Sequence, residues 1–404
     1  MTNKIREVKV ITGANYGDEG KGVVSNYFTK RAVQRDMRVL NVLFNGGCQR
    51  GHTVNGHIFH SFGAGAIEGA DTYYTRKFMV DPIVWFNEYN ELGQKPKLII
   101  HPGAWVVTPY DVMINQALER KRGDARHGSC GFGIFETRHR CEQMENHLLA
   151  KDLSNEEILF EKLNKIKKEY YPARCEELGI EVEFNPYMFD NFMTCAHQMM
   201  KCGDVSFSGP EVFFNYESII FEGGQGLLLS EENTDNYPYL TPSITSYKGA
   251  EVELLYLLKN TKAEFEFCLV SRPYLTRHGA GPLPYECEKE KLSDKIIDET
   301  NMPNEWQGSL RFAPLNLRTS FAMGSTIAHY ESILFKYPYE YPQVTLKFSK
   351  AITCLDQTDG MVKFWSNHDE EIKSFPVSAL CAWKEKLYAF YGKDTLPNII
   401  MGLQ

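Results

Sequence analysis

Residues Thr12–Val24 read TGANYGDEGKGVV, between a short apolar run, Val8–Ile11, and a helical pattern, Val23–Ala32. This order predicts a strand, a glycine-rich turn and a helix. The glycines let the backbone approach a ligand closely and present its N–H groups, which is typical of phosphate-binding loops. The spacing differs from the G-x-x-x-x-G-K-[ST] pattern of the ordinary P-loop. The simpler alternative is a turn and helix cap with incidental charges.

The charged residues of this loop indicate its chemistry. Lys21 supplies a point charge suited to a phosphate, with an exposed surface lysine as the alternative. Asp18 and Glu19 are unexpected there, because carboxylates repel phosphate unless a metal ion or a proton intervenes. The combination therefore predicts Mg²⁺ or a general base in the site. For Asp18, a helix N-cap is the structural alternative.

The composition favours a soluble globular protein. The chain has 404 residues, of which 43% are hydrophobic and 24% are charged, and we expect a single domain over residues 1–404. A formal net charge of -8 argues against nucleic acid as the main partner. Residues 1–8 are polar and charged, and no apolar run is long enough to span a membrane, so a cytoplasmic location is expected. Ten scattered cysteines without a CxxC pair predict reduced thiols.

The alternation of strands and helices along the chain predicts an α/β fold. Its central sheet is expected to be mostly parallel, with helices on both faces and inserted loops. Further strands are expected at residues 38–44, 77–84, 97–101, 218–221, 265–271, 352–356 and 398–401. Helices are expected at residues 84–92, 109–119, 154–178, 187–202 and 374–391. Residues 120–140 are basic and glycine-rich, and they predict a loop near the site.

Four of the expected strands run into glycine-rich loops that carry reactive side chains. These loops hold Asp18 with Lys21, then His52, Gln225 and Arg277. The carboxyl ends of parallel strands meet at one edge of a sheet, so the four loops are expected to form one site. Any one of these residues alone could be structural, and a lone histidine usually is.

The loops resemble, in order, the motifs of the adenylosuccinate synthetase family. The family motifs WGDEGKGK, GGxNAGHTV, GTTGRGI, FEGAQGxLL, YPFVT, TRVGxGPFP and TKLDVLDG have their counterparts at residues 16–23, 46–54, 128–134, 221–229, 237–241, 276–284 and 353–360. The blocks extend over nearly the whole chain. The resemblance implies that family's fold, which is related to P-loop proteins.

The same resemblance implies a C–N ligase that uses IMP, aspartate, GTP and Mg²⁺. Asp18 matches the base that takes the N1 proton of the purine, and it shares Mg²⁺ with the Gly51 carbonyl. O6 of the purine then attacks the γ-phosphate, and the aspartate amine displaces the resulting 6-phosphoryl group. His52 and Lys21 match groups on the transferred phosphoryl, and Gln225 matches a contact near O6.

The remaining positions are carried over motif by motif. The resemblance implies that the nucleoside triphosphate is bound by Gly17, Glu19, Gly20, Lys21, Gly22, Gly51, His52, Thr53 and Asp356. It implies that the purine nucleoside monophosphate is bound by Asp18, Gln49, Ser129, Cys130, Arg140, Gln225, Thr241 and Arg277. Arg140, with Arg138 as the alternative, matches the arginine that reaches a neighbouring subunit, so a homodimer is implied. Arg311 is the candidate for the carboxylates of aspartate. A surface role for Arg311 and a strand-end role for Asp356 stay open.

Three departures from the family motifs bear on the substrates. Gln49 and Arg50 replace Asn and Ala in the second loop, and Cys354 replaces a lysine that contacts guanine. The aspartate loop keeps only Arg311 of its arginines. Viral members of the family that act on dGMP and use ATP are therefore an alternative. A nucleotide-binding homologue without ligase activity is a further one.

Overall fold

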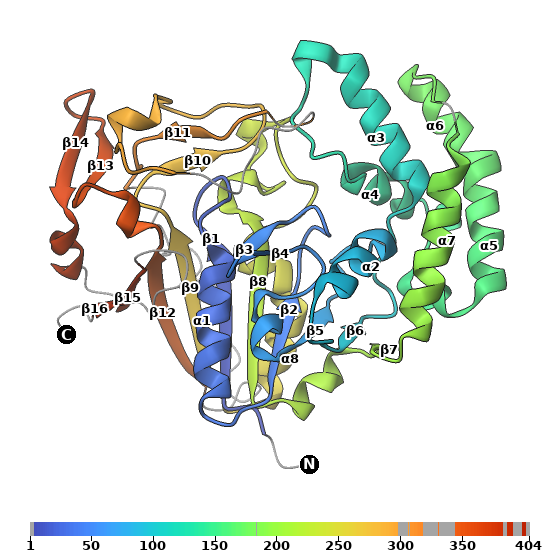
Figure 1. Ribbon diagram of the computed structural model, residues 1–404, viewed down its shortest axis with the longest axis horizontal. Helices are drawn as coiled ribbons and strands as arrows, with labels where there is room; N and C mark the ends of the chain where they lie inside the picture. The colour runs from blue at the N-terminus through green and yellow to red at the C-terminus, as the bar shows by residue number, and fades with distance from the viewer. Residues whose placement is uncertain are drawn as a thin grey trace.

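A ten-stranded sheet forms the centre of the protein (Figure 1). The computed structural model describes residues 4–182, 184–297, 306, 308–317, 330, 344–382, 386–390 and 398–400. In spatial order the strands are β16 (Asn398–Ile400), β15 (Lys386–Ala389), β12 (Thr345–Ile352), β9 (Glu264–Ser271), β1 (Glu7–Gly13), β8 (Ser218–Gly226), β2 (Val39–Leu43), β5 (Asp71–Tyr74), β6 (Leu98–Ile100) and β7 (Val205–Phe207). All neighbouring pairs are parallel except β15 and β16. The predicted α/β fold with a mostly parallel sheet is confirmed.

Helices pack around this sheet. They are α1 (Lys21–Val33), α2 (Pro82–Glu91), α3 (Pro109–Arg122), α4 (Ile134–Glu142), α5 (Glu156–Lys165), α6 (Tyr171–Leu178), α7 (Pro186–Lys201) and α8 (Glu251–Asn260). Among the described residues, no helix is both long and apolar enough to cross a membrane. Small antiparallel pairs lie outside the sheet: β3 (His52–Val54) with β4 (His57–Phe59), β10 (Leu275–Arg277) with β11 (Arg311–Ala313), and β13 (Met361–Ser366) with β14 (Glu371–Pro376).

The two faces of the sheet are covered by different helices, as predicted. Alternate residues of a strand point to opposite faces, so each central strand contributes to two cores. Val10 of β1 packs in one cluster with Leu254 of α8, whereas the next residue, Ile11, packs with Val24 of α1. Both faces of the central strands are apolar, as expected for a parallel sheet buried on both sides.

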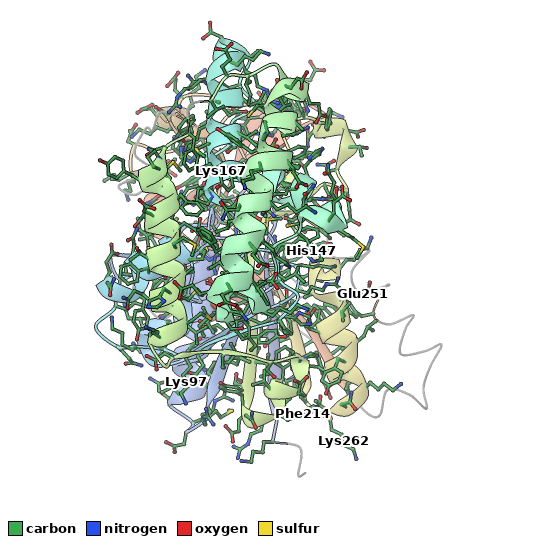
Figure 2. The ribbon with its side chains drawn as sticks, turned by 90° about the vertical axis from the view of Figure 1, so that its right-hand side faces the viewer. Lys97, His147, Lys167, Phe214, Glu251 and Lys262 are labelled. Carbon is green, nitrogen blue, oxygen red and sulfur yellow. The ribbon has the colours of Figure 1, made fainter. Side chains whose placement is uncertain are left out.

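Helices α5, α6 and α7 form a separate layer at the right-hand side of the molecule in Figure 1. Figure 2 views this side, on which Lys167 lies in the π-helical turn Ile166–Tyr170 between α5 and α6. The helix predicted for residues 154–178 is thus one long helical segment with a local widening. Its apolar residues pack with α2, α3 and α7 in the largest hydrophobic cluster of the described residues.

Four predictions of secondary structure were wrong. The strand predicted for residues 352–356 ends at Ile352 as β12, and Leu355–Gln357 form a 3₁₀ helix. In residues 77–84, only Met79 and Val80 form isolated bridges, α2 begins at Pro82, and the strand of this region is β5, before them. Residues 374–391 contain the end of β14, a short 3₁₀ helix and β15 instead of a helix, because a short apolar run can be buried as either element. The loop predicted for residues 120–140 ends at Gly133, where α4 begins. Residues 304, 305, 307 and 401, on which other predictions fell, lie outside the described residues.

Gly226 allows the end of β8 to pack against the glycine-rich loop. A Cβ atom there would overlap the carbonyl oxygen of Asn15 and lie 2.5 Å from the amide nitrogen of Gly17. We therefore expect Gly226→Ala to lower the free energy of unfolding by about 1–3 kcal/mol, because both contacts are backbone and cannot rotate away. Denaturant unfolding measures the change. Gly93→Ala is the matched control, since a Cβ at Gly93 meets nothing within 4 Å. Equal stability of the two variants would contradict this packing.

Candidate active site

A cavity of about 1290 Å³ opens at the carboxyl edge of the central sheet. The carboxyl ends of β1, β2, β8 and β9 and the segments after them contribute five side chains to its lining: Asp18, Lys21 at the start of α1, His52 at the start of β3, Gln225 near the end of β8, and Arg277 at the end of β10. These four strands are consecutive in the central sheet, in the order β9, β1, β8 and β2. The predicted convergence of four strand ends on one site is thus what the structure shows. In Figure 1 the carboxyl ends of the central strands are their upper ends.

The glycine-rich loop is held in shape by its own carboxylate. Glu19 is 2% exposed and accepts hydrogen bonds from the backbone N–H groups of Asn15 and Gly17, each 2.9 Å long, and from Lys21 at 2.7 Å. Burial alone would raise the pKa of Glu19, but Lys21 and these N–H groups hold it below the usual value. Glu19 therefore faces the interior of the loop and does not line the cavity. It fixes the loop and Lys21, which does line it.

Asp18, by contrast, lines the cavity. The N-cap of α1 is Gly20, and no side chain caps the helix, so the alternative in which Asp18 is the N-cap is excluded. Burial raises the pKa of Asp18, while the nearby positive charges of Arg272 and Lys21 oppose the rise. Asp18 has a φ of 58°, a left-handed conformation that is uncommon for a residue with a side chain. A carboxylate with a raised pKa at the cavity wall is suited to accept a proton.

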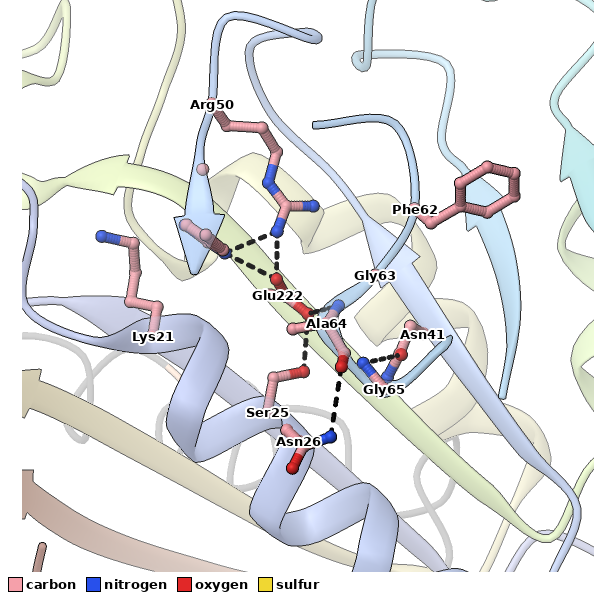
Figure 3. A network of polar contacts seen from close by, with 12 residues as sticks. Lys21, Ser25, Asn26, Asn41, Arg50, Phe62, Gly63, Ala64, Gly65 and Glu222 are labelled. Carbon is pink, nitrogen blue, oxygen red and sulfur yellow. Dashed lines mark hydrogen bonds and ion pairs between the residues drawn. The ribbon is translucent and has the colours of Figure 1, made fainter. Parts of the chain in front are cut away.

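His52, at the start of β3, meets a buried carboxylate of β8 in the central sheet. Its Nδ1 lies 2.6 Å from Oε1 of Glu222, and the Arg50 guanidinium contacts both groups. Figure 3 shows the contact between Arg50 and Glu222. Burial and the Arg50 charge lower the pKa of His52 to about 4. Burial would raise the pKa of Glu222, but Arg50 and His52 bring it to about 2. Nε2 of His52 is buried and has no hydrogen-bond partner among the described residues, so it is available to a ligand.

Amide side chains also line the cavity. Gln225 accepts a hydrogen bond of 3.0 Å from Asn45, and both Gln225 and Gln49 line the cavity. Oε1 of Gln49 is buried without a partner in the described part of the chain. Gly46 has a φ of 72°, and a Cβ atom there would lie 2.7 Å from Gln49 and 2.9 Å from Gln225. Glycine at this position thus makes room for two amides that can recognise a polar purine edge.

The loop before α4 supplies small donors to the cavity wall. The hydroxyl of Ser129 donates to Asn115 of α3 at 2.9 Å and accepts from the backbone N–H of Gly131. Cys130 also lines the cavity, and burial raises the pKa of its thiol to about 11, so it stays neutral near pH 7. Thr241 lies on the same wall.

Arg277 reaches the cavity but uses its donors within the protein. Its guanidinium donates to the carbonyl oxygens of Ala280, Pro282 and Tyr239, at 3.0, 2.7 and 3.0 Å. It also lies over the ring of Tyr16, 4.7 Å from the centroid. Arg277 therefore fastens three cavity loops to one another.

The structure places the predicted site residues in two groups. Those that line the cavity are Gly17, Asp18, Gly20, Lys21, Gly22, Gln49, Gly51, His52, Thr53, Ser129, Cys130, Gln225, Thr241 and Arg277. Those that do not are Glu19, Arg140, Arg311 and Asp356. Asp356 is exposed. Arg311 donates to Glu286 and to the carbonyl oxygens of Gly279 and Gly281.

Arg140 is buried in the fold instead of facing a ligand. It is fully buried, donates to both oxygens of Asp111, and donates to the carbonyl oxygens of Asn146 and Val106. Arg138, the alternative considered from the sequence, lines the cavity and contacts Glu142 and Glu231. The preference for Arg140 as a phosphate ligand thus does not fit the structure, because all its contacts are internal.

Other cavity residues were missed from the sequence. Arg272 and His278 line the cavity, and both are close enough to Asp18 to lower its pKa. Arg272 directly follows β9, so the strand-end position that singled out the other residues could have found it. In the sequence, Arg50 stands out only as a departure from a motif, and nothing local shows that it meets Glu222 of β8.

The donors at the cavity fit Mg²⁺ bound together with a phosphorylated ligand. Among the described residues, no group of three or more His, Cys, Asp and Glu side chains could hold a metal. Mg²⁺ usually takes one or two protein oxygens and completes its shell with phosphate and water. Asp18 and the Gly51 backbone both line the cavity and match that pattern.

These features define an α/β protein with a glycine-rich phosphate-type loop and a large polar cavity at the carboxyl edge of its sheet. A model of the family described as adenylosuccinate synthetase matches residues 10–303. Adenylosuccinate synthetase from Saccharophagus degradans is 29% identical over 297 residues, and that from Teredinibacter turnerae is 28% identical over 302 residues. The matches cover 69% and 70% of this chain, and 65% of each relative. The chain belongs to the adenylosuccinate synthetase family.

Two solved structures have folds similar to that of this chain. The fully ligated adenylosuccinate synthetase from Plasmodium falciparum aligns over 91% of this chain and 82% of its own, with a TM-score of 0.67 and 18% identity. The succinoaminodeoxyadenylate synthetase of cyanophage S-2L, bound to dGMP and dATP, aligns over 87% and 86%, with a TM-score of 0.52 and 16% identity. The family match ends at residue 303, so the resemblances at residues 304–311 and 353–360 lie beyond it.

The pair Arg138 and Arg140 allows the two arginine environments to be compared directly. Arg140→Ala is expected to lower the free energy of unfolding by about 3–5 kcal/mol, because it leaves the charge of Asp111 buried and unpaired. Arg138→Ala removes partly exposed ion pairs, so its expected cost is about 0–1 kcal/mol. Denaturant unfolding of both variants tests this difference. A similar small cost for both would show that Arg140 does not hold the fold.

Proposed function

We propose that this protein joins aspartate to C6 of a 6-oxopurine nucleoside monophosphate, with hydrolysis of a nucleoside triphosphate. IMP as substrate, GTP as phosphoryl donor and adenylosuccinate as product are the leading assignment. The observation that carries the proposal is the convergence of Asp18, Lys21, His52 and Gln225 on one cavity, in a chain of this family. The chain spans about 65% of the length of the curated relatives it matches, so the activity is inferred from the site.

The reaction follows from what each side chain can do. Asp18 takes the proton of N1, which makes O6 nucleophilic towards the γ-phosphorus, and the nucleoside diphosphate leaves. The aspartate amine then attacks C6, and phosphate leaves with O6. The negative charge of the bound phosphates raises the pKa of His52, so that its imidazolium donates from Nδ1 to Glu222 and from Nε2 to the transferred phosphoryl oxygens. Gln225 holds the purine edge near O6.

The other binding roles follow from the cavity lining. Lys21 and the backbone N–H groups at the start of α1 bind the triphosphate, and the helix dipole adds to that attraction. Mg²⁺, held by Asp18 and the Gly51 carbonyl, would neutralise phosphate charge. The small donors Ser129, Cys130 and Thr241 bind the monophosphate. Arg311 remains the candidate for aspartate, although its present partners would have to be exchanged.

A homodimer would place one further arginine in the site. Arg138 lines the cavity and has partly exposed ion-pair partners, so it is better placed than Arg140 to reach a phosphate of a neighbouring subunit. The exposed Phe135 and Met144 flank it near α4. We therefore assign the intersubunit role to Arg138.

The alternative substrates are dGMP and ATP, which would give 2-amino-deoxyadenylosuccinate. The observation that favours them is Cys354, which lines the cavity where the family motif has a lysine for guanine. A cysteine at this position lacks the charged donor of the lysine, and Asp356 is exposed outside the cavity. The presence of Asp18 favours IMP chemistry. A homologue that binds nucleotide without ligating aspartate is the remaining alternative.

Substrate pairing distinguishes these assignments. The protein is incubated with Mg²⁺, aspartate, and each pairing of IMP, GMP or dGMP with GTP or ATP, and formation of succinyl-purine is followed. The proposal predicts product with IMP and GTP. Product with dGMP alone would replace the leading substrate, and no product in any pairing would exclude the ligase. Omitting Mg²⁺ is expected to stop the reaction.

Asp18 is the residue on which the first step depends. Asp18→Ala is expected to lower kcat by about 10²–10⁴-fold, the usual contribution of a positioned general base. Binding of the purine monophosphate in the absence of triphosphate is expected to persist, because Gln225, Ser129 and Thr241 remain. Calorimetry and single-turnover kinetics measure the two effects. Substantial residual activity would place the base elsewhere.

A further inference from the structure

Arg50 lines the cavity, and one amino group of its guanidinium contacts other side chains of the protein. It is 2% exposed, and its Nη2 contacts Oε1 of Glu222 (Figure 3). The same Nη2 contacts Nδ1 of His52. The other oxygen of Glu222 accepts from the hydroxyl of Ser25 at 2.6 Å and from the backbone N–H of Ala64 at 2.9 Å. Glu222 thus has a partner on each lone-pair side, and a single amino group of Arg50 is enough to satisfy it.

The rest of the guanidinium has no such partner. Nε and Nη1 of Arg50 are buried and find no acceptor among the described residues. Arg50 also lines the cavity, between Gln49 and Gly51 and in the same wall as Lys21 and His52. A guanidinium stays charged under all ordinary conditions, and buried N–H donors require an acceptor. A ligand in the cavity would supply the acceptor that completes this group.

The charges around Arg50 indicate what that ligand is. Lys21 is paired with Glu19, and Nη2 of Arg50 is paired with Glu222, so the two acidic residues hold two cations in place at the cavity wall. Arginine N–H groups match phosphate oxygens in geometry and charge. The unpartnered Nε2 of His52 belongs to the same wall.

We propose that Arg50 is a catalytic residue that binds the transferred phosphoryl group through Nε and Nη1, while Nη2 stays on Glu222. This inference rests on the proposed function for the identity of the phosphoryl group. Arg50 adds a permanent positive charge next to His52 as the P–O bond to the diphosphate breaks and the bond to O6 forms. The alternative is that Arg50 only neutralises Glu222.

A double-mutant cycle separates the two roles. Arg50→Ala is expected to lower kcat by about 10²-fold, the usual loss for one donor to developing charge. The KM for the purine monophosphate is expected to stay within about threefold, because Arg50 meets the phosphoryl group that is in transfer. In the Glu222→Gln background, Arg50→Ala is expected to lower kcat by a similar factor. No further loss in that background would show that Arg50 acts only as the counter-charge of Glu222 and would overturn the proposal.

Two further variants control for folding. Arg50→Gln keeps N–H donors towards Glu222 but loses the charge, so it covers the case in which Arg50→Ala does not fold, and it is expected to be equally slow. Arg38→Ala is the matched surface control: Arg38 stands before β2, at the opposite edge of the sheet, with a side chain 60% exposed. A kcat of Arg50→Gln close to that of Arg38→Ala would overturn the proposal.

Binding of inorganic tripolyphosphate with Mg²⁺ distinguishes failure of this inference from failure of the proposed function. Isothermal calorimetry on the full chain needs no turnover. Arg50→Ala is expected to weaken tripolyphosphate about tenfold, or about 1.4 kcal/mol, whereas Arg38→Ala leaves it unchanged. If the wild-type protein forms no succinyl-purine but this loss is seen, the ligase assignment fails and the phosphoryl contact of Arg50 stands. Equal binding by the Arg50→Ala and Arg38→Ala variants would overturn the contact itself.

Discussion

Glu222 is the buried carboxylate on which the site depends. It lies in the middle of β8. It joins the start of α1 through Ser25, the turn at Ala64, and the second loop through Arg50 and His52. Leaving a buried charge without its partners costs about 3–5 kcal/mol. The partners are therefore held in one arrangement, which fixes the ring of His52 with Nε2 directed to the ligand side.

The acidic residues that look misplaced in a phosphate site thus have a common physical role. Glu19 and Glu222 each bind one cation, Lys21 and Arg50, and neither carboxylate is exposed to the cavity as a free charge. A triphosphate then meets cations that are already positioned, and no long flexible side chain has to be ordered on binding. Asp18 is different, because it stays at the cavity wall, where a proton acceptor is useful.

The sequence predicted the parallel sheet and the convergence of four strand ends, because both follow from local glycine and apolar patterns. It did not predict Arg140 correctly, since nothing local to residues 138–140 shows that Asp111 of α3 lies opposite. The contact of Arg50 with Glu222 joins residues 172 positions apart, and it also required the fold. The helix predicted near the C-terminus was wrong because Leu387 and Tyr388 are buried in a strand.

The path of one oxygen atom tests the central claim most directly. A 6-oxopurine monophosphate labelled with ¹⁸O at position 6 is converted by the protein in the presence of Mg²⁺, aspartate and the triphosphate, and the released phosphate is analysed by mass spectrometry. If O6 attacks the γ-phosphorus at a site formed by Asp18, Lys21 and His52, the label appears in inorganic phosphate. Succinyl-purine formed with unlabelled phosphate would contradict the account.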